Sequence, residues 1–505
     1  MIKKKNILLC GVLPDPWIEV GRSLEQNEYI IKYWIGWDTE DSKKRVTDLF
    51  KEVTFLENYK AWKGFNVNED RVTLKNNVSI PLSFWTTLSQ EIRIALKMFD
   101  RLDSDGHSFN FMQREDFLYD LVSIWFDRLI SYEIDFVIFS VVPHRGFDYI
   151  LYLVAKFLNK DVLMFKHTYI ASVVSPIEDI SGGTIPMEES NPFAIDVFNL
   201  LKDKAISYQT EISEEAIVPT YMIEQKSTNN LQGVFKSFFW HLLPKNAFKE
   251  SLVSLRYRFK NPYKHSPLNV RIAYKNSFLN LSRLRRLKAE YHKRITNVNL
   301  DDGKNYFLFG LHYQPEETTV PSAGIFYNQF SLIKHISSKL PENSVLIVKE
   351  HTTQFHPNYD GHRGRYRDIY ESIKDLPNVV MINDEISSNL LLKKVTAVFT
   401  LTGTIGLEAL LRGKPVIVFG NAWYRKINGV IDIFGNPELY DDLNDKLIKL
   451  PKIENSAIFD FFRSISKDLL PVYLYKGYKK FGLNDTQQNS AILTEYVMKW
   501  LKKKQ

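Results

Sequence analysis

The stretch best suited to bind an anion is a polar corner between two apolar runs. In VFTLTGTIGLEALLRGKPVIVFG, residues 398–420, an apolar strand is expected to lead through a Thr/Gly corner into a short helix and then a second strand. The first N–H groups of a helix lack partners within it, and glycine lets an anion approach them closely. The sequence therefore predicts a phosphate site here. The residues expected to bind the phosphate-bearing ligand are Thr402, Gly403, Thr404, Gly406 and Glu408.

A purely structural explanation of the same corner is a helix capped by Thr, with glycine present for close packing. The corner also lacks the G-x-x-x-x-G-K-[ST] pattern, because Lys414 follows the helix and precedes Pro415. Cleavage of a nucleoside triphosphate is therefore not expected.

Two further polar groups follow predicted strands of the same half. In LIVKEH, Lys349 and His351 are two residues apart, so they share one face where the strand ends. A cation and an imidazole there could neutralise a leaving phosphate or protonate it. In LHYQPEETT, the sequence offers His312, Gln314 and Glu316, which would share a face if the strand continued to Pro315. Glu316 could accept hydrogen bonds from sugar hydroxyls or act as an acid or base if buried, and a polar loop before the next helix is the alternative.

The first half of the chain offers candidates for an acceptor side and a general base. SVVPHRGFDY places His144, Arg145 and Asp148 just after a predicted strand, and GVLPDPWIEVG does the same for Asp15 and Glu19. We take Asp15 and His144 as the catalytic candidates, with ordinary surface loops as the alternative.

No metal site is expected. The D-x-D at residues 103–105 follows a helical pattern instead of a strand, which favours a helix-ending turn. A single cysteine, Cys10, excludes a disulfide framework and multi-cysteine metal sites, and fits the cytoplasm.

The apolar pattern indicates an α/β fold with two Rossmann-like halves. Strand and helix signals alternate from residue 6 and again over 135–165, and a second series begins near Tyr306. Such halves would face one cleft, with ligand at the carboxyl ends of the strands. With 505 residues, 44% apolar and 25% charged, the chain is expected to be globular, with no transmembrane helix. MIKKKNILLCGV is interpreted as a first β-strand and not as a signal peptide.

Between the two series lies a basic segment. Residues 226–294 hold 16 Lys and Arg against two acidic residues, whereas the whole chain has a net charge of +7. Within it, GVFKSFFWHLLPKNAFKESL mixes aromatic and basic residues and could lie on an anionic membrane surface, each nearby Lys or Arg adding about 1 kcal/mol. A core helix with a solvated basic face remains the alternative. Nucleic acid is not expected as a partner, because no recognition motif accompanies the charge.

The ordered set LHYQPEETT, VKEH and TLTGTIGLEALLRGKPVIVFG resembles the bacterial capsule polysaccharide synthesis family, which includes β-Kdo transferases and has a two-domain GT-B architecture. The resemblance implies a metal-independent glycosyltransferase acting on a membrane-associated glycan, with its nucleotide-sugar donor on the C-terminal half. The known Kdo transferases use a CMP-activated donor. By the resemblance, His351 and the corner from Thr402 to Thr404 would hold the donor phosphate, with Glu316 near the sugar or ribose. Thr352 stands where many relatives have proline, so the loop after His351 is expected to differ.

These observations predict a GT-B-like glycosyltransferase of capsule or O-antigen synthesis that needs no cofactor and transfers an ulosonic sugar from a CMP donor. Its expected partners are the nucleotide-sugar donor and a glycan or lipid-linked glycan acceptor, at the inner face of the cytoplasmic membrane. The expected domains are an N-terminal acceptor domain (1–215), a basic helical segment (216–302), a C-terminal nucleotide-sugar domain (303–455) and terminal helices that return to the first domain (456–505). A CDP-dependent polyol-phosphate transferase, a UDP-sugar transferase or epimerase, and a non-catalytic scaffold remain alternatives.

Overall fold

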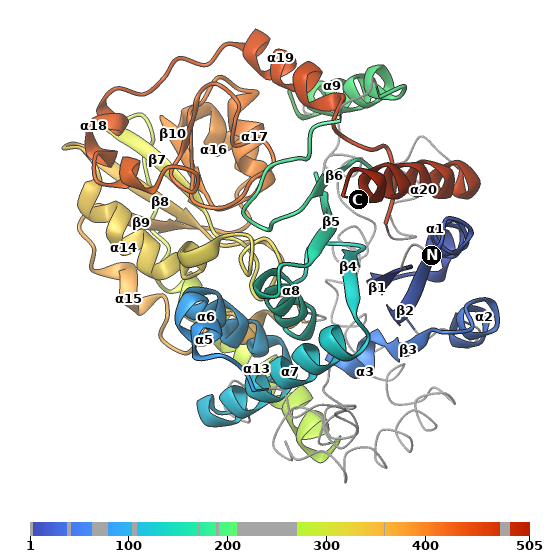
Figure 1. Ribbon diagram of the computed structural model, residues 1–505. Helices are drawn as coiled ribbons and strands as arrows, with labels where there is room; N and C mark the ends of the chain where they lie inside the picture. The colour runs from blue at the N-terminus through green and yellow to red at the C-terminus, as the bar shows by residue number, and fades with distance from the viewer. Residues whose placement is uncertain are drawn as a thin grey trace.

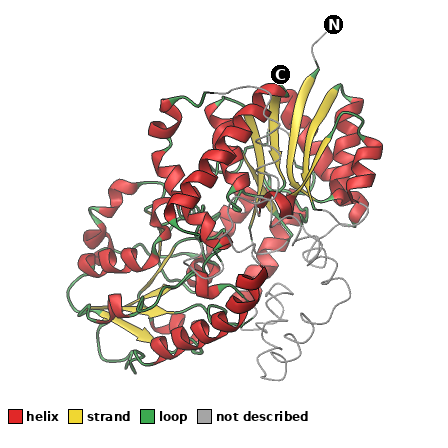
Figure 2. Cartoon of the chain, turned by 90° about the horizontal axis from the view of Figure 1, so that it is seen from below, coloured by secondary structure: helices red, strands yellow, loops and turns green. Residues whose placement is uncertain are grey.

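The protein is built on two separate α/β sheets, each flanked by helices (Figures 1 and 2). The computed structural model describes residues 4–37, 42–62, 79–103, 109–168, 172–187, 191–209, 270–357, 359–474 and 485–504. The two-sheet arrangement confirms the predicted α/β fold with two Rossmann-like halves, the layout of the GT-B class.

The N-terminal sheet has the order β3-β2-β1-β4-β5-β6, and all its strands pair in parallel except β6, which is antiparallel to β5. Its strands are β1 (Lys5–Val12), β2 (Tyr29–Gly36), β3 (Thr54–Glu57), β4 (Ile134–Phe139), β5 (Asp161–His167) and β6 (Val174–Ile177). The helices of this half are α1 (Pro14–Gln26), α2 (Ser42–Leu49), α3 (Asn58–Trp62), α5 (Leu82–Thr87), α6 (Ser89–Met98), η1 (Phe99–Leu102), α7 (Phe111–Ser131), α8 (Phe147–Phe157) and α9 (Ala194–Gln209).

The continuous apolar run of β1 follows from burial on both faces. One face of the sheet packs under α6, α7 and α8, and the other under α1 and the last helix, α20 (Thr486–Lys503). Because both faces are covered, a central parallel strand needs apolar residues at successive positions. The lysine-led N-terminal stretch is accordingly a strand, as the sequence predicts.

The C-terminal sheet has the order β12-β11-β10-β7-β8-β9, entirely parallel. Its strands are β7 (Asn305–Gly310), β8 (Ser344–Lys349), β9 (Val379–Ile382), β10 (Ala397–Thr400), β11 (Val416–Val418) and β12 (Val430–Asp432). The other elements of this half are α13 (Val270–His292), η3 (Gly324–Tyr327), α14 (Gln329–Lys339), η4 (Gly361–Arg363), α15 (Glu371–Lys374), α16 (Ser388–Lys394), α17 (Thr404–Leu410), η5 (Pro437–Tyr440), α18 (Leu443–Ile448) and α19 (Asn455–Ser466).

The direction in which successive strands are added to this sheet reverses between β7 and β10. The chain moves outward from β7 through β8 to β9, then returns to the other side of β7 with β10. Loops that leave neighbouring strands in opposite directions open a crevice at the carboxyl ends, where open α/β sheets bind their ligands. The loops after β7, β8 and β10 therefore surround the expected ligand position.

The helices at the ends of each half cross to the other half. α9 precedes the basic segment, yet it packs with α19 on the C-terminal sheet, while α20 packs on α1 of the N-terminal sheet (Figure 1). Both chain termini thus lie on the N-terminal half. The domain boundaries at 215, 302 and 455 stay a prediction.

Polar contacts also join the two halves. The side chain of Asn421, after β11, donates to the carbonyls of Ile180 (2.6 Å) and Gly182 (3.1 Å) in the N-terminal half. In return, Lys166 of β5 donates to the carbonyl of Asn421. A second link runs from Arg101 of η1 to the carbonyl of Val320 (3.2 Å).

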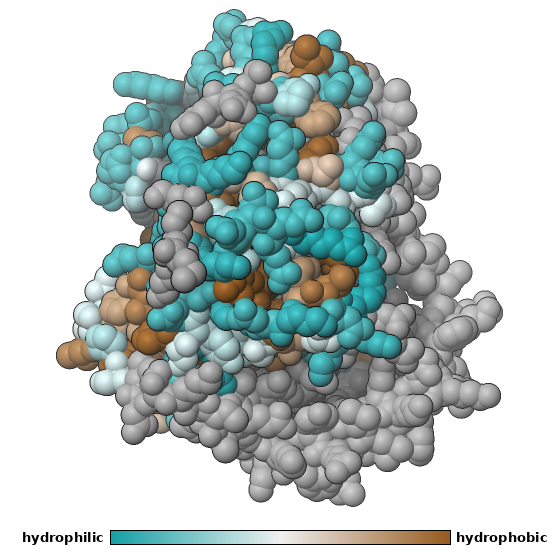
Figure 3. Space-filling model, turned by 45° about the vertical axis from the view of Figure 1, so that its right-hand side comes forward, coloured by the Kyte–Doolittle hydropathy of each residue, from teal (hydrophilic) through white to brown (hydrophobic). Residues whose placement is uncertain are grey.

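The face shown in Figure 3 is largely hydrophilic, with hydrophobic side chains in small separate groups. Among the helices of the described ranges, none combines the length and apolarity needed to cross a membrane. The aromatic and basic stretch at 233–252 and most of the predicted 216–302 segment lie outside the described residues, whereas α13 gives this segment a helix at its end.

Candidate functional site

The loops after β7 and β10 meet as the strand order requires. The backbone N–H of Thr402 donates to Nε2 of His312 (3.1 Å), and Oγ1 of Thr402 donates to the carbonyl of Thr318 (2.8 Å). The two sequence motifs that contain these residues, 90 positions apart, are therefore one structural unit.

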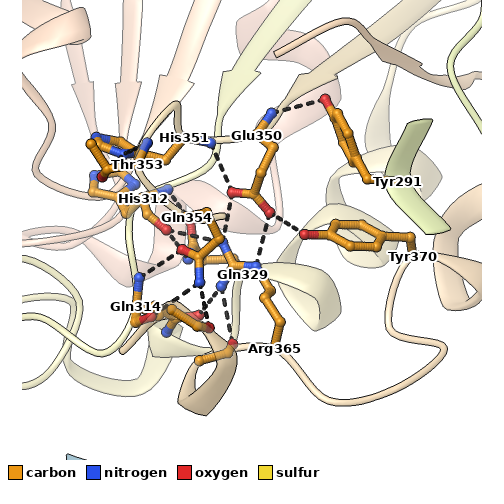
Figure 4. Close-up of polar contacts among 12 residues, drawn as sticks. Tyr291, His312, Gln314, Gln329, Glu350, His351, Thr353, Gln354, Arg365 and Tyr370 are labelled. Carbon is orange, nitrogen blue, oxygen red and sulfur yellow. Dashed lines mark hydrogen bonds and ion pairs between the residues drawn. The ribbon is translucent and has the colours of Figure 1, made fainter. Parts of the chain in front are cut away.

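A fully buried ion pair holds this unit in place (Figure 4). Glu350 receives two hydrogen bonds of 2.9 Å from the guanidinium of Arg365, and a further one from the hydroxyl of Tyr370 at 2.5 Å. The same guanidinium donates to the side chain of Gln314 (2.8 Å) and the carbonyl of His312 (3.0 Å). One buried cation thus fixes the loops after β7 and β8 against each other.

The loop after β7 is rigid through its own side chains as well. β7 ends at Gly310, so the strand does not continue to Pro315, and the face-sharing expected of His312, Gln314 and Glu316 does not arise from strand geometry. Both polar atoms of the Gln314 amide are used, by Arg365 and by the carbonyl of Tyr327 (3.0 Å). The contacts of Gln314 therefore position the loop.

His312 is neutral and buried. Burial and, to a smaller extent, the charge of His351 lower the pKa of His312 to about 3. Hydrogen bonds with the Gln329 side chain and the Gly310 carbonyl act in the opposite direction. Since Nε2 accepts the Thr402 N–H, the ring proton is on Nδ1. His312 thus orients the corner at Thr402–Thr404 through its ring, and its backbone N–H donates to the side chain of Gln329 (2.7 Å).

His351 presents a fixed hydrogen-bond donor. Its Nδ1 accepts from the backbone N–H of Thr353 (3.3 Å) and lies 2.7 Å from the Thr353 hydroxyl, so the ring proton is on Nε2. Burial lowers its pKa to about 4; the Glu350 carboxylate opposes this shift and the nearby Lys349 ammonium adds to it. His351 is therefore a neutral donor at physiological pH, with the buried cation of Lys349 at the end of β8 close by.

Glu316 is the titratable group of the site. It is half-buried, and burial raises its pKa to about 7; the adjacent Glu317 adds to the shift, whereas a hydrogen bond from Thr318 (3.1 Å) and the charge of Arg101 oppose it. A carboxyl group with this pKa exchanges its proton near neutral pH, as a general acid or base requires.

The corner before α17 is closely packed, and the N–H of Gly403 is already used, because it donates to Oγ1 of Thr400 (3.1 Å). The helix begins at Thr404, and no side chain caps it within the described chain, so the alternative of a Thr N-cap is not found. A Cβ at Gly403 would lie 3.1 Å from Nε2 of His312, and one at Gly406 would lie 2.2 Å from the Tyr424 hydroxyl. Gly406 therefore serves packing, while the first turn of α17 faces the crevice side of β10.

Glu408 lies one turn into the same helix. Its carboxylate accepts from the hydroxyl of Thr404 at 3.2 Å. Through this contact Glu408 orients Thr404, the first residue of α17.

In the N-terminal half, His144 stands beside two cations. Its Nδ1 donates to the carbonyl of Val142 (2.7 Å), which leaves Nε2 as an acceptor. Burial, together with Arg145 and Arg101, holds the pKa of His144 well below its usual range. Asp148 accepts the backbone N–H groups of His144 and Arg145 and thereby fixes this loop.

Asp15 is engaged elsewhere. It is exposed on α1 and pairs with Arg45 of α2 at 2.9 Å, whereas His144 follows β4. No contact between Asp15 and Glu316 is found among the described residues. The catalytic role of Asp15 therefore stays a prediction.

Sequence reasoning missed the residues that hold the site together. Glu350 stands between Lys349 and His351, and strand alternation already places it on the opposite face, where a buried carboxylate needs a partner. That partner, Arg365, could not be separated by sequence from Arg363 and Arg367 nearby.

Part of the chain matches a known protein family. The sequence profile described as "Capsule polysaccharide biosynthesis protein" matches residues 229–433, a range that contains all three motifs of the site. This match supports the predicted resemblance to the capsule polysaccharide synthesis family over that part of the chain. The chain is also 29% identical over 136 residues to Protein FixF of Sinorhizobium fredii, a match that covers 26% of this chain and 30% of FixF.

Among solved structures, the chain is similar to the β-Kdo 2,7 transferase KpsC of Thermosulfurimonas dismutans, at 12% identity and a TM-score of 0.31, covering 74% of this chain and 89% of that one. It is also similar to UDP-GlcNAc 2-epimerase of Neisseria meningitidis, at 14% identity and a TM-score of 0.22, covering 98% and 100%. Because both TM-scores are below 0.5, the fold assignment rests on the strand order described above.

No group of three or more His, Cys, Asp or Glu side chains in the described ranges is arranged to hold a metal ion. Asp103 of the D-x-D follows η1, and its carboxylate pairs with Arg114 at 3.0 Å. Metal independence stays a prediction.

Proposed function

We propose that this protein is a glycosyltransferase of bacterial capsule or O-antigen synthesis that binds a nucleotide-sugar donor on its C-terminal half. The match of residues 229–433 to the capsule polysaccharide biosynthesis family supports the pathway. The observation that carries the reaction class is Glu316, a half-buried carboxyl group with a pKa of about 7 beside the phosphate corner.

In the proposed reaction, the bond between the sugar and the donor phosphate breaks while the acceptor oxygen bonds to the anomeric carbon. Glu316 takes the proton of the acceptor hydroxyl. The Nε2–H of His351, the Lys349 ammonium and the first N–H groups of α17 stabilise the leaving phosphate. In this proposal, Nε2 of His144 accepts a hydrogen bond from the acceptor hydroxyl. His144 does not act as the general base, because its low pKa makes it a weak base.

The donor is proposed to be a CMP-activated ulosonic sugar, used without a metal or cofactor, and the acceptor a lipid-linked glycan at the inner membrane face. These finer assignments rest on the resemblance of the three motifs to Kdo transferases of the family. Gln314 and His312 serve in this proposal as positioning residues for the donor loop.

The first test is the thermal stabilisation of the purified protein by CMP, CDP, UDP and GDP. A ligand that binds only the folded state raises its stability by RT ln(1 + [L]/Kd), about 2.7 kcal/mol at 100 times Kd. We expect selective stabilisation by CMP, reduced in His351→Ala and retained in His335→Ala, which lies on α14. Selectivity for CDP would favour a polyol-phosphate transferase, and selectivity for UDP a UDP-sugar transferase or epimerase. A folded protein that responds to no nucleotide would contradict the proposal and favour a scaffold.

A further inference from the structure

Arg101 is a buried cation that forms no ion pair with the residues that the structure describes. Its side chain is at least nine-tenths buried, with 9% of the residue exposed. Its Nη2 donates to the carbonyl of Val320 (3.2 Å), but its Nη1 has no hydrogen-bond partner among the residues that the structure describes. Burial of this kind lowers the pKa of the guanidinium to about 10, even with Asp148 and Glu316 nearby.

A neighbouring arginine has the ion pairs that are expected of a purely structural residue. Arg114, on α7, pairs with Asp100 at 2.6 Å and with Asp103 at 3.0 Å. Arg101 lies between these two carboxylates in sequence, yet neither pairs with it within the described chain. A buried charge without an ion pair costs several kcal/mol, so the retention of Arg101 calls for a partner beyond the side chains that the structure describes.

The surroundings of Arg101 lie between the two halves of the protein. A small pocket is lined by Lys97, Asp100 and Arg101 from the N-terminal half, and by Gln314, Thr319 and Gly364 from the C-terminal half. The Asp100 carboxylate in this lining is already paired with Lys97 and Arg114. The backbone of Arg101 is fixed as well, because its carbonyl accepts from the guanidinium of Arg363. The charge of Arg101 also reaches Glu316, whose pKa it lowers. The unpaired cation therefore stands at a fixed position next to the proposed base.

We propose that Arg101 binds the carboxylate of an acidic sugar substrate in this pocket, and so makes the enzyme selective for acidic sugars. This inference rests on the proposed glycosyltransferase function. A guanidinium matches the planar, bidentate geometry of a carboxylate, and the bond is charge-assisted on both sides. The pocket is small, which suits a single oxyanion group and not a whole nucleotide. The nucleotide phosphate is assigned instead to the corner at Thr402–Thr404.

The test compares wild type, Arg101→Gln, Arg101→Lys and the control Lys97→Gln by calorimetric titration with CMP and with CMP-Kdo. Lys97 lines the same pocket, but it is more exposed and already pairs with Asp100 at 2.6 Å. We expect wild type to bind CMP-Kdo more tightly than CMP. Arg101→Gln should lose about tenfold or more of that difference while binding CMP normally, since a hydrogen bond to a charged group contributes about 1.5–3 kcal/mol. Arg101→Lys should restore part of the difference, and Lys97→Gln should match wild type.

Other outcomes would overturn the inference. Equal weakening of CMP and CMP-Kdo in Arg101→Gln would assign Arg101 to the nucleotide phosphate. Unchanged binding of both ligands would make Arg101 structural. If wild type binds neither CMP nor CMP-Kdo, the glycosyltransferase proposal fails. The anion site at Arg101 is then tested separately, by measuring how far free Kdo raises the melting temperature. Ligand-free Arg101→Gln should then melt no lower than wild type and lose the stabilisation by Kdo, whereas a lower melting temperature with unchanged stabilisation would reject the site.

Discussion

Burial acts in opposite directions on the two titratable groups of the donor side. Removing a group from water disfavours its charged form, which raises the pKa of a carboxyl group and lowers that of an imidazole. Glu316 accordingly has a pKa of about 7, and His351 one of about 4. Around neutral pH, Glu316 changes its charge while His351 stays a neutral donor. The pH dependence of the reaction is therefore expected to follow Glu316.

Replacing Glu316 tests this directly. We expect Glu316→Gln to lower transfer by about 10²–10⁴-fold, the usual contribution of a general acid or base. For wild type, kcat/KM should rise with pH through about 7 as the carboxyl group ionises, and this limb should be absent from the variant. Transfer measured from pH 5.5 to 8.5 with a CMP-sugar donor gives both results.

The stability of the same variant has a defined sign. Because the pKa of Glu316 is raised in the folded state, its contribution to stability is present below about 4.5 and is lost as the pH rises through about 7. Glu316→Gln should therefore gain stability relative to wild type between pH 5 and pH 8, measured by melting. Glu342→Gln, which changes an exposed carboxylate before β8, is the control for transfer. Full transfer activity in a folded Glu316→Gln would exclude Glu316 as the base.

The sequence predicts Glu316 and His351 as site residues because each follows a recognisable apolar strand in a short polar motif. It could not identify Arg101, since a cation at the end of an amphipathic helix is usually solvated, and only the docking of the second half buries it. Tertiary burial, which no local pattern records, thus decided which arginine matters.

At the scale of elements, the site is two loops fastened to one buried ion pair. Gln354 extends this fastening, because its side chain donates to the carbonyls of Gln314 (3.1 Å) and Gly361 (2.7 Å). Gly364 lets the loops approach, since a Cβ there would lie 2.2 Å from the Gln314 carbonyl oxygen. The position of His351 is therefore set by contacts made some fifteen residues further along the chain, at Arg365.

Removing Arg365 should destabilise the protein strongly. Arg365→Gln leaves the Glu350 carboxylate buried without its cation, and breaking a buried pair in this way costs about 3–5 kcal/mol. Urea denaturation should show this loss, and Glu350→Gln combined with Arg365→Met should recover part of it. The control is Arg463→Gln, in a pair whose side chains are each 68% exposed, with an expected change within about 0.5 kcal/mol. A loss for Arg365→Gln no larger than the control's would show that the pair does not support the loops.

The strands could be predicted from the sequence, whereas these loops could not. β1, β4, β8 and β10 are apolar runs because both faces of each sheet are covered, and such runs are visible locally. The loop after β8 has no such periodicity, and its conformation depends on which arginine reaches Glu350.

At the scale of the molecule, the two halves are tied by crossed elements and by Asn421. α9 packs on the C-terminal sheet and α20 on the N-terminal one, so each half contains a helix from the other end of the chain. The side chain of Asn421 bonds the N-terminal half through its amide nitrogen and Arg425 (3.0 Å) through its oxygen. These contacts hold the halves in the closed arrangement that places Arg101 beside Glu316.

Lys166 reports on this closure because the second half is what buries its ammonium group. It is 9% exposed and donates to the carbonyl of Asn421; burial lowers its pKa to about 8, Glu317 opposes the shift and Arg425 adds to it. Between pH 8 and the ordinary value of 10.5, the unfolded chain keeps the proton that the folded protein has released, so stability from this group rises with pH.

The substitution Lys166→Met removes this titratable group. The free energy of unfolding of wild type should therefore rise relative to that of Lys166→Met from pH 7 to pH 10, measured by urea denaturation at each pH. Other groups cancel in this difference, and Lys160→Met on the surface should show no trend. A difference that stays constant over this range would mean that Lys166 is hydrated, and hence that the two halves are apart in solution.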